Sequence, residues 1–129
     1  MEKLPYAESF RDLFAYQKAQ ELAICIFDIS HDFPSHELYS LTQQIRRSSR
    51  SIGAQISEAW AKRRYKKHFV SKLTDALAEL NETEHWIATA AQCGYVSPKA
   101  ARELNADCSQ LGHLLGEMIA KADHFCKDT

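Results

Sequence analysis

Apolar residues recur along most of this chain at steps of three and four, the spacing of one face of an α-helix. The first such segment lies near Ser9 to Ser30, and the apolar residues of its shared face are Leu13, Tyr16, Ala19, Ala23, Ile26 and Phe27. Proline disfavours helical backbone at the residue before it. We therefore expect this helix to stop before Pro34, because Phe33 cannot readily continue it.

A second helix follows the Phe-Pro pair, and the sequence allows two starts for it. Ser35 can cap it, or Ser40 and Gln43 can form an S-x-x-Q capping box one turn later. Both starts stay open. At about 100° per residue its apolar positions form one stripe about 80° wide, and the members are Leu41, Ile45, Ser48, Ile52, Ile56 and Ala59.

Two more helices complete the pattern. After a weak break at "KRRYKK", a third helix runs to Gly94, a residue suited to the C′ position, and its stripe is Phe69, Leu73, Ala76, Leu80, Ile87 and Ala91. Ser97 as N-cap and Pro98 at the first helical position begin a fourth helix. Its stripe is Leu104, Cys108, Leu111, Leu115, Met118, Ala122 and Phe125.

The four stripes together predict the fold class. The chain has only four glycines and three prolines, and it shows no window of alternating β-branched residues that would indicate a strand. We predict an all-α protein, an up-down-up-down antiparallel four-helix bundle that forms a single domain over residues 1–129.

Cysteine usage and hydropathy bear on the compartment. The four cysteines, Cys25, Cys93, Cys108 and Cys126, form no C-x-x-C pair and follow no secretory signal, so we expect reduced core thiols in a cytoplasmic protein. No apolar run approaches the ~18 residues of a membrane span. The sequence therefore predicts a soluble protein with no membrane partner.

Positive charge is concentrated in the middle of the chain. Residues 46–72 hold nine of the sixteen lysines and arginines, although the net charge is −1. Arg46, Arg47 and Arg50 project away from the apolar stripe of the second helix, toward water or a partner. If the second and third helices form a hairpin turning near Tyr65, these arginines lie level with an acidic line on the third helix. That line comprises Asp75, Glu79 and Glu82, and it ends at Trp86. We expect arginines and acids to pair, within a subunit or between subunits.

The hairpin tip is a separate basic segment, formed by Lys62, Arg63, Arg64, Tyr65, Lys66 and Lys67. Each cation could neutralise a phosphate, and Tyr65 could stack on a base. The alternative is a solvated tip that only keeps a turn soluble. The nucleic-acid hypothesis uses this tip first, with Arg46, Arg47 and Arg50 as a second rank.

Small residues mark a further face of the second helix, comprising Gly53, Ala54, Ser57 and Ala61. A solvated face would more usually carry Lys, Glu or Gln, whereas small residues let another backbone approach closely. We predict that this face mediates self-association.

Signals of catalysis or metal binding are weak. Glu82 and His85 have the E-x-x-H spacing of di-iron bundles, but the chain has no second such pair, and both residues project far from the apolar stripe. There is no G-x-S-x-G elbow and no Gly-rich phosphate loop. We predict no enzyme, no cofactor, no metal site and no small-molecule substrate.

Two long segments carry a family resemblance, "FRDLFAYQKAQELAICIFDIS" and "FPSHELYSLTQQIRRSSRSIGAQISEAWAKR". They resemble the four-helix bundle family that includes the 23S rRNA intervening sequence proteins. The matching positions, in order, are Phe10, Asp12, Leu13, Tyr16, Gln17, Lys18, Ala19, Phe33, Pro34, Glu37, Leu41, Thr42, Gln44, Arg46, Arg47, Ser51, Ile52 and Glu58. The chain departs from the family pattern at Gln55 and Ala59, where the family usually has Asn and Gly, and at "ALAEL" in the third helix.

The resemblance implies an assembly. Such proteins are similar in fold to the accessory variability protein of diversity-generating retroelements, a five-subunit barrel that binds nucleic acid and a reverse transcriptase. It therefore implies a ring-like homopentamer. Two functions remain open: an oligomeric module that binds RNA or DNA, and a structural or protein-interaction scaffold that binds neither.

Overall fold

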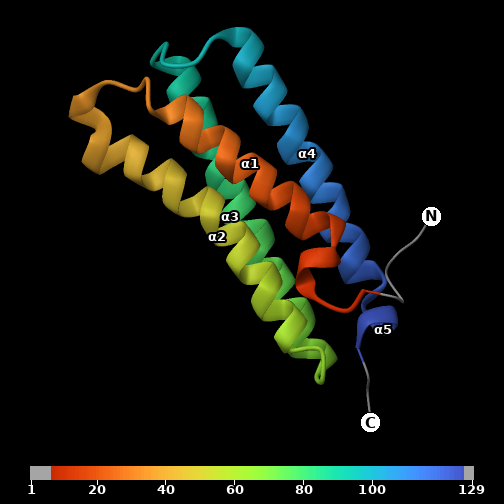
Figure 1. The fold of residues 1–129 in the computed structure, drawn as a ribbon. Helices are drawn as coiled ribbons and strands as arrows, with labels where there is room; N and C mark the ends of the chain where they lie inside the picture. Colours follow the sequence, from red (N-terminus) through yellow and green to blue (C-terminus); the bar gives the residue numbers. More distant parts are fainter. Residues whose placement is uncertain (1–6, 127–129) are drawn as a thin grey trace.

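The computed structural model describes residues 7–126, and every element in that range is helical. The elements are η2 (Phe10–Asp12), α1 (Phe14–Ser30), η3 (Ser35–Glu37), η4 (Leu38–Thr42), α2 (Gln43–Ala61), α3 (Lys66–Gln92), α4 (Pro98–Ala120) and α5 (Ala122–Phe125). Figure 1 shows the four long helices packed side by side as a bundle, with the short α5 at one end. The all-α bundle predicted from the apolar stripes is confirmed.

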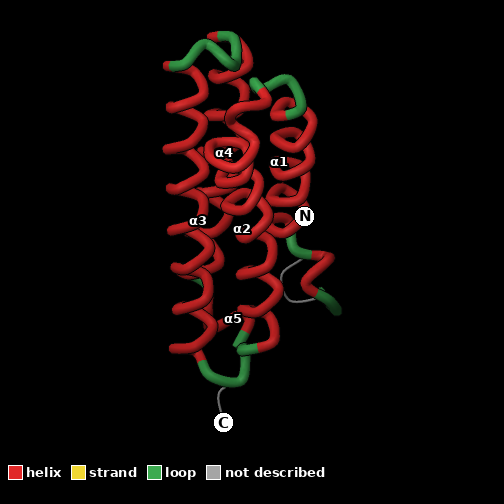
Figure 2. Tube along the Cα trace, turned by 90° about the vertical axis from the view of Figure 1, so that its left-hand side faces the viewer, coloured by secondary structure: helices red, strands yellow, loops and turns green. Residues whose placement is uncertain are grey.

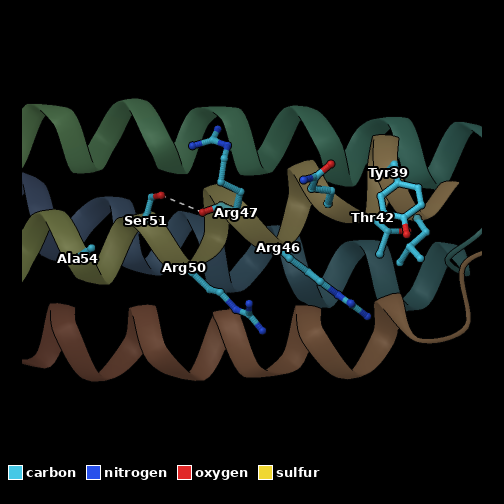
Figure 3. Close-up of a pocket in the computed structure, with 9 residues that line it drawn as sticks. Tyr39, Thr42, Arg46, Arg47, Arg50, Ser51 and Ala54 are labelled. Atoms are coloured by element: carbon cyan, nitrogen blue, oxygen red, sulfur yellow. Dashed lines mark hydrogen bonds between the residues drawn. The ribbon is translucent and has the colours of Figure 1, made fainter.

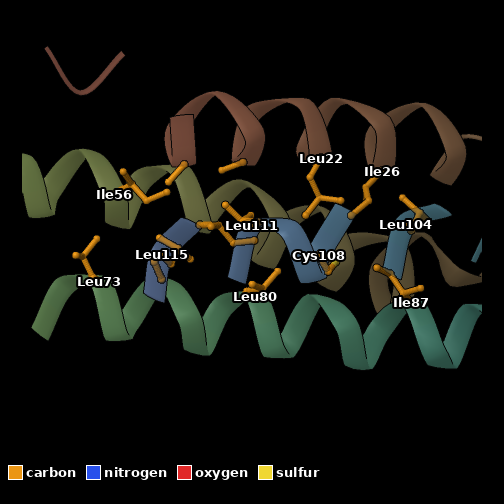
Figure 4. Close-up of a cluster of buried hydrophobic side chains, with 14 of the residues drawn as sticks. Leu22, Ile26, Ile56, Leu73, Leu80, Ile87, Leu104, Cys108, Leu111 and Leu115 are labelled. Carbon is orange, nitrogen blue, oxygen red and sulfur yellow. The ribbon is translucent and has the colours of Figure 1, made fainter. Parts of the chain in front are cut away.

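The apolar stripes meet in one core, except that Phe27 of the predicted first stripe lies outside it. Every predicted stripe residue of α2 and of the α4 to α5 segment is buried, and of the predicted α3 residues Ala91 alone is only half-buried. Figure 4 shows side chains from all four long helices interleaved in this core, among them Leu22, Ile56, Leu73 and Leu111. Burying one large aliphatic side chain contributes about 1.5–3 kcal/mol. The core therefore sets which face of each helix remains outside.

The start of the second helical segment differs from both predicted starts, because the π-helix η4, with Glu37 as its N-cap, leads into α2. Neither Ser35 nor Ser40 caps it with its side chain. Instead, the carboxylate of Glu37 accepts hydrogen bonds from the backbone N–H of Leu41 (3.4 Å) and from the hydroxyl groups of Ser40 (2.7 Å) and Tyr95 (2.8 Å). Ser40 thus donates to a nearby carboxylate rather than accepting from the helix. These bonds lower the pKa of Glu37 and raise the pKa of Tyr95 to about 12.

The predicted signals between α3 and α4 are confirmed. Gly94 has a φ of 76°, a left-handed conformation that favours glycine. The backbone N–H of Tyr95 donates to the carbonyl of Ala90 (2.9 Å), and that of Gly94 to Ala91 (3.0 Å), which is a Schellman motif. Ser97 then caps α4 by accepting from the N–H of Ala100 (3.0 Å).

Helices α2 and α3 form the antiparallel hairpin expected from the sequence. The hydroxyl group of Thr83 donates to that of Ser48 (2.9 Å) in the core, and nearer the turn Lys72 pairs with Glu58 (2.7 Å). The residue numbers of both pairs sum to about the same value, so the helices run antiparallel and turn at Tyr65. This register places Arg46 and Arg50 level with the middle of α3.

The cysteine prediction is confirmed only in part. All four cysteines are free thiols, but only Cys108 is fully buried, whereas Cys25 and Cys126 are half-buried and Cys93 is exposed at the end of α3. Burial raises the pKa of the Cys108 thiol to about 12. Within residues 7–126, no helix combines the length and apolar content needed to cross a membrane.

Candidate functional site

Arg47 meets the acids of α3, as the sequence predicted. Its guanidinium pairs with the carboxylates of Glu79 (3.5 Å) and Glu82, and the indole N–H of Trp86 also donates to Glu82 (3.1 Å). The hydrogen bond from Arg47 is the main cause of the lowered pKa of Glu82, and that same bond raises the pKa of Arg47. The pairing lies within one chain and joins α2 to α3. The third acid of the predicted line, Asp75, is exposed.

Within one chain, Arg46 and Arg50 do not pair with the acids of α3, so the predicted pairing within a subunit is wrong for these two residues, and their pairing between subunits stays a prediction. The guanidinium of Arg46 donates from Nε to the hydroxyl of Ser30 (2.7 Å) and lies 4.8 Å from the ring centroid of Phe27. Arg50 lies 5.2 Å from the same centroid. Both side chains therefore reach α1, as Figure 3 shows, while Arg47 points to α3. Adjacent helical positions differ by about 100°, so neighbouring arginines face opposite flanks of α2.

A shallow groove follows the outer face of α2 between these flanks (Figure 3). We call it the α2 groove. It has a volume of about 630 Å³ and opens widely to solvent. The residues lining it are Leu38, Tyr39, Thr42, Gln43, Arg46, Arg47, Arg50, Ser51 and Ala54. Tyr39, at one end, is 85% exposed. The groove is thus an apolar strip with guanidinium groups along both edges.

The small-residue face divides between two environments. Gly53 is buried under α1 of its own chain, where a Cβ atom would lie 2.9 Å from Oε1 of Gln20. Its placement on an outer interface is therefore wrong. Ala54 and Ala61 are exposed, and half-buried Ser57 donates its hydroxyl to the carbonyl of Ala54 (2.8 Å).

The hairpin tip contains two anchored cations. Arg63 donates from Nε to the carbonyl of Trp60 (2.8 Å), and its guanidinium lies 3.6 Å from the centroid of the Trp60 ring. Burial of this group lowers the pKa of Arg63. Lys66 pairs with Asp123 of α5 at 2.9 Å. These two cations of the tip are therefore held by partners within their own chain.

The other tip residues face solvent. Lys62, Arg64, Tyr65 and Lys67 are all exposed, Tyr65 by 56%. The Tyr65 ring lies 5.3 Å from the ring of His68. Figure 2 shows α5 beside this end of the bundle, where the ring of Phe125 stacks on Phe69 at 5.6 Å. The turn is thus supported from below by the core and carries an aromatic ring among three accessible cations.

The E-x-x-H pair does not converge on a common site. The carboxylate of Glu82 accepts hydrogen bonds from Arg47 and Trp86. His85 is exposed, and its ring lies 4.6 Å from that of Trp86. Sequence reasoning missed two contributors to the candidate sites, Phe27 beneath two arginines and Asp123 beside Lys66. A contact between distant segments leaves no periodic signal in the sequence.

Comparison with known proteins agrees with this fold. The family model described as 23S rRNA-intervening sequence protein matches residues 11–117. A crystal structure of a protein of unknown function from the S23 ribosomal protein family of Bacteroides thetaiotaomicron is 30% identical, with a TM-score of 0.74, over 82% of this chain and 95% of that one. No curated protein matches the chain. This chain belongs to the 23S rRNA-intervening sequence protein family.

Proposed function

We propose that this protein is a non-catalytic, self-associating module that binds RNA or DNA through its hairpin tip. The observation that carries the proposal is the joint exposure of Lys62, Arg64, Tyr65 and Lys67 around one turn. A single-stranded nucleic acid needs cations for its phosphates and a ring for its bases, and both occur here within six residues.

The local charge at the tip favours this function despite the net charge of −1. Exposed charges are screened beyond roughly 8 Å at physiological ionic strength, so distant acids do not cancel the tip. The nearby acids Glu58 and Asp123 already face Lys72 and Lys66, at 2.7 and 2.9 Å. The exposed cations therefore act on an approaching phosphate with little competition.

Salt-dependent binding tests this proposal. The variant K62Q/R64Q removes one lysine and one arginine from the tip. Its matched control, K99Q/R102Q, removes the same two residue types from exposed positions near the start of α4, at the other end of the bundle (Figure 1). Fluorescence anisotropy with a labelled single-stranded RNA measures affinity between about 50 and 200 mM salt.

We expect the tip variant to bind more weakly and to lower the salt slope by about 1.4, since each lost phosphate contact on a single strand accounts for about 0.7. The control should bind like the unaltered protein. Absence of binding by the unaltered protein at about 50 mM salt would overturn the proposal. An equal loss in both variants would also contradict it, because the binding would then be a property of overall charge.

The assembly is the second part of the proposal. We infer an up-down-up-down bundle that forms a ring-like homopentamer, which the family resemblance supports, in the cytoplasm, which the free cysteines favour. Native mass spectrometry checks the assembly against the chain mass of 14.7 kDa. A complex of five chains is expected.

The interaction scaffold remains a second candidate function, and one observation favours it. Tyr39 and Leu38 are large and exposed at one end of the α2 groove, and exposed apolar surface of this kind marks contact with another protein. A scaffold assembles without binding nucleic acid, so an intact complex that fails the anisotropy assay would favour it.

A further inference from the structure

Most of the large exposed apolar side chains gather on two surfaces. Among the described residues these side chains are Phe14 (46% exposed), Ile24 (60%), Leu38 (45%), Tyr39 (85%) and Tyr65. Tyr65 belongs to the hairpin tip. Leu38 and Tyr39 line the α2 groove, and Phe14 and Ile24 both lie on α1. Two separate apolar surfaces on one small domain call for a partner for each.

The α1 residues form a regular outer stripe, which we call the α1 stripe. Its members are all exposed and follow alternating steps of three and four: Phe14, Gln17, Glu21, Ile24 and Asp28. At about 100° per residue they cover an arc of about 80° opposite the core. This is the spacing by which one helix packs along another. The stripe is therefore a helical ridge with apolar and acidic side chains.

The charges of the stripe and the groove are opposite. The stripe carries the carboxylates of Glu21 and Asp28, and the groove carries Arg46 and Arg50. Arg47 already meets two acids in its own chain, whereas the contacts of Arg46 and Arg50 are to a hydroxyl group and an aromatic ring. Glu21 has a long contact of 3.9 Å with Lys18, whose nearer partner is Asp107 at 3.0 Å. Both acids can therefore pair with an arginine of a second copy.

The α1 stripe and the α2 groove are also similar in length. At 1.5 Å per residue, the stripe from Phe14 to Asp28 spans about 21 Å, and the groove from Tyr39 to Ala54 spans about 22 Å. A chain cannot make this contact with itself, because its own α1 meets α2 through Gln20 and Phe27, on a different side from the stripe. The two surfaces can meet only between two copies.

We propose that the α1 stripe of one copy docks into the α2 groove of a second copy. This inference rests on the self-association in the proposed function and names its surfaces. Each copy then uses one surface to contact one neighbour and the other surface to contact the next. Such a head-to-tail contact repeats, and it produces a closed ring when the rotation between copies closes.

Substitutions at two exposed residues test the contact between the α1 stripe and the α2 groove. I24K replaces an apolar residue of the stripe with a cation facing the arginines, and R50E places an acid in the groove facing Glu21 and Asp28 of the neighbour. Each variant keeps one surface intact. A106E, at an exposed position of α4, is the matched control for adding surface charge. Circular dichroism checks that each variant remains helical.

Native mass spectrometry measures the outcome. We expect A106E to assemble like the unaltered protein, and I24K and R50E each to give only the 14.7 kDa chain. A mixture of I24K and R50E should recover complexes of at least two chains, because the intact stripe of R50E fits the intact groove of I24K, while the introduced lysine of one copy can face the introduced glutamate of the other.

The inference is overturned if the unaltered protein is monomeric, if either variant keeps the full assembly, or if the mixture stays monomeric. A full assembly that persists in both variants overturns these surfaces but leaves self-association standing. Failure of the RNA assay leaves the contact untouched, because the hairpin tip lies outside both surfaces.

Discussion

The α2 groove and the hairpin tip both carry clustered cations, yet their surroundings differ. In the groove, Arg46 and Arg50 lie over Phe27, and Arg47 is held by two acids of α3. At the tip, Arg63 is similarly held by Trp60, whereas the exposed Arg64 lies 5.9 Å from the centroid of Tyr65, a ring that is itself exposed. Basic residues thus differ in accessibility according to which aromatic ring or acid the neighbouring element provides. Clustering in the sequence is therefore not enough to identify a binding surface.

Removing the Phe27 ring should have the largest effect on the free energy of unfolding. It would leave Arg46 and Arg50 without an aromatic ring beneath them, so that they resemble the accessible cations of the tip. The half-buried ring of Phe27 packs beneath two guanidinium groups, so we expect F27A to lower the free energy of unfolding by about 2 kcal/mol. Urea denaturation measures this loss. H113A, at an exposed position of α4 outside both proposed contact surfaces, is the control, with an expected change below about 0.5 kcal/mol. Equal losses in both variants would contradict a packing role for the Phe27 ring.

The tip itself contains a matched pair of arginines that sharpens the comparison. R63K keeps the charge but loses the planar group over Trp60, so we expect the free energy of unfolding to fall by about 1 kcal/mol. R64K should leave it unchanged. RNA affinity, measured by anisotropy, should change by less than about twofold in both variants, since each keeps its cation. A stability loss in R64K as large as that in R63K would contradict the distinction between an anchored and an accessible arginine.

Breaking the ion pairs of Arg47 should have the smallest effect. Glu82 is half-buried, so E82Q should lower the free energy of unfolding by about 0.5 kcal/mol at neutral pH. D75N is the matched control on the exposed side of the same helix and should have no measurable effect. Urea denaturation of the two variants under the same conditions checks this difference.

The E82Q variant also tests how the stabilising effect of Glu82 depends on pH. The folded-state pKa of Glu82 is lowered from its ordinary value of 4.5, first by the hydrogen bond from Arg47. Its stabilising contribution is therefore present above that value and is lost as the pH falls through the folded-state pKa. The difference in stability between the unaltered protein and E82Q should shrink as the pH drops below 4.5. A constant difference across that range would show that the charge of Glu82 contributes nothing.

The long helices and their buried faces could be predicted, because hydrophobic spacing alone determines which side of an amphipathic helix meets the core. The caps at Gly94 and Ser97 were also predictable, since each depends on one residue and its local backbone. The start of α2 was not. Glu37, which caps the preceding η4, is held by Tyr95, a residue of the turn between α3 and α4 that local patterns do not connect to it.

The candidate sites could be predicted only in part, because the contacts of their side chains join segments that are distant in the sequence. Periodicity placed Arg46, Arg47 and Arg50 outside the core, but it did not say which flank of α2 each would occupy. Arg47 turned to the acids of α3, as expected, while the other two turned to α1. Gly53 was likewise assigned to an outer face, although α1 covers it.

The sequence by itself determined the helices, the core and the register of the α2–α3 hairpin, because these follow from local spacing and one short turn. Only the tertiary structure decided which cations are held, which face α1 covers, and where the α1 stripe and α2 groove lie. These features depend on how neighbouring helices are rotated about their axes. That rotation results from packing among distant residues.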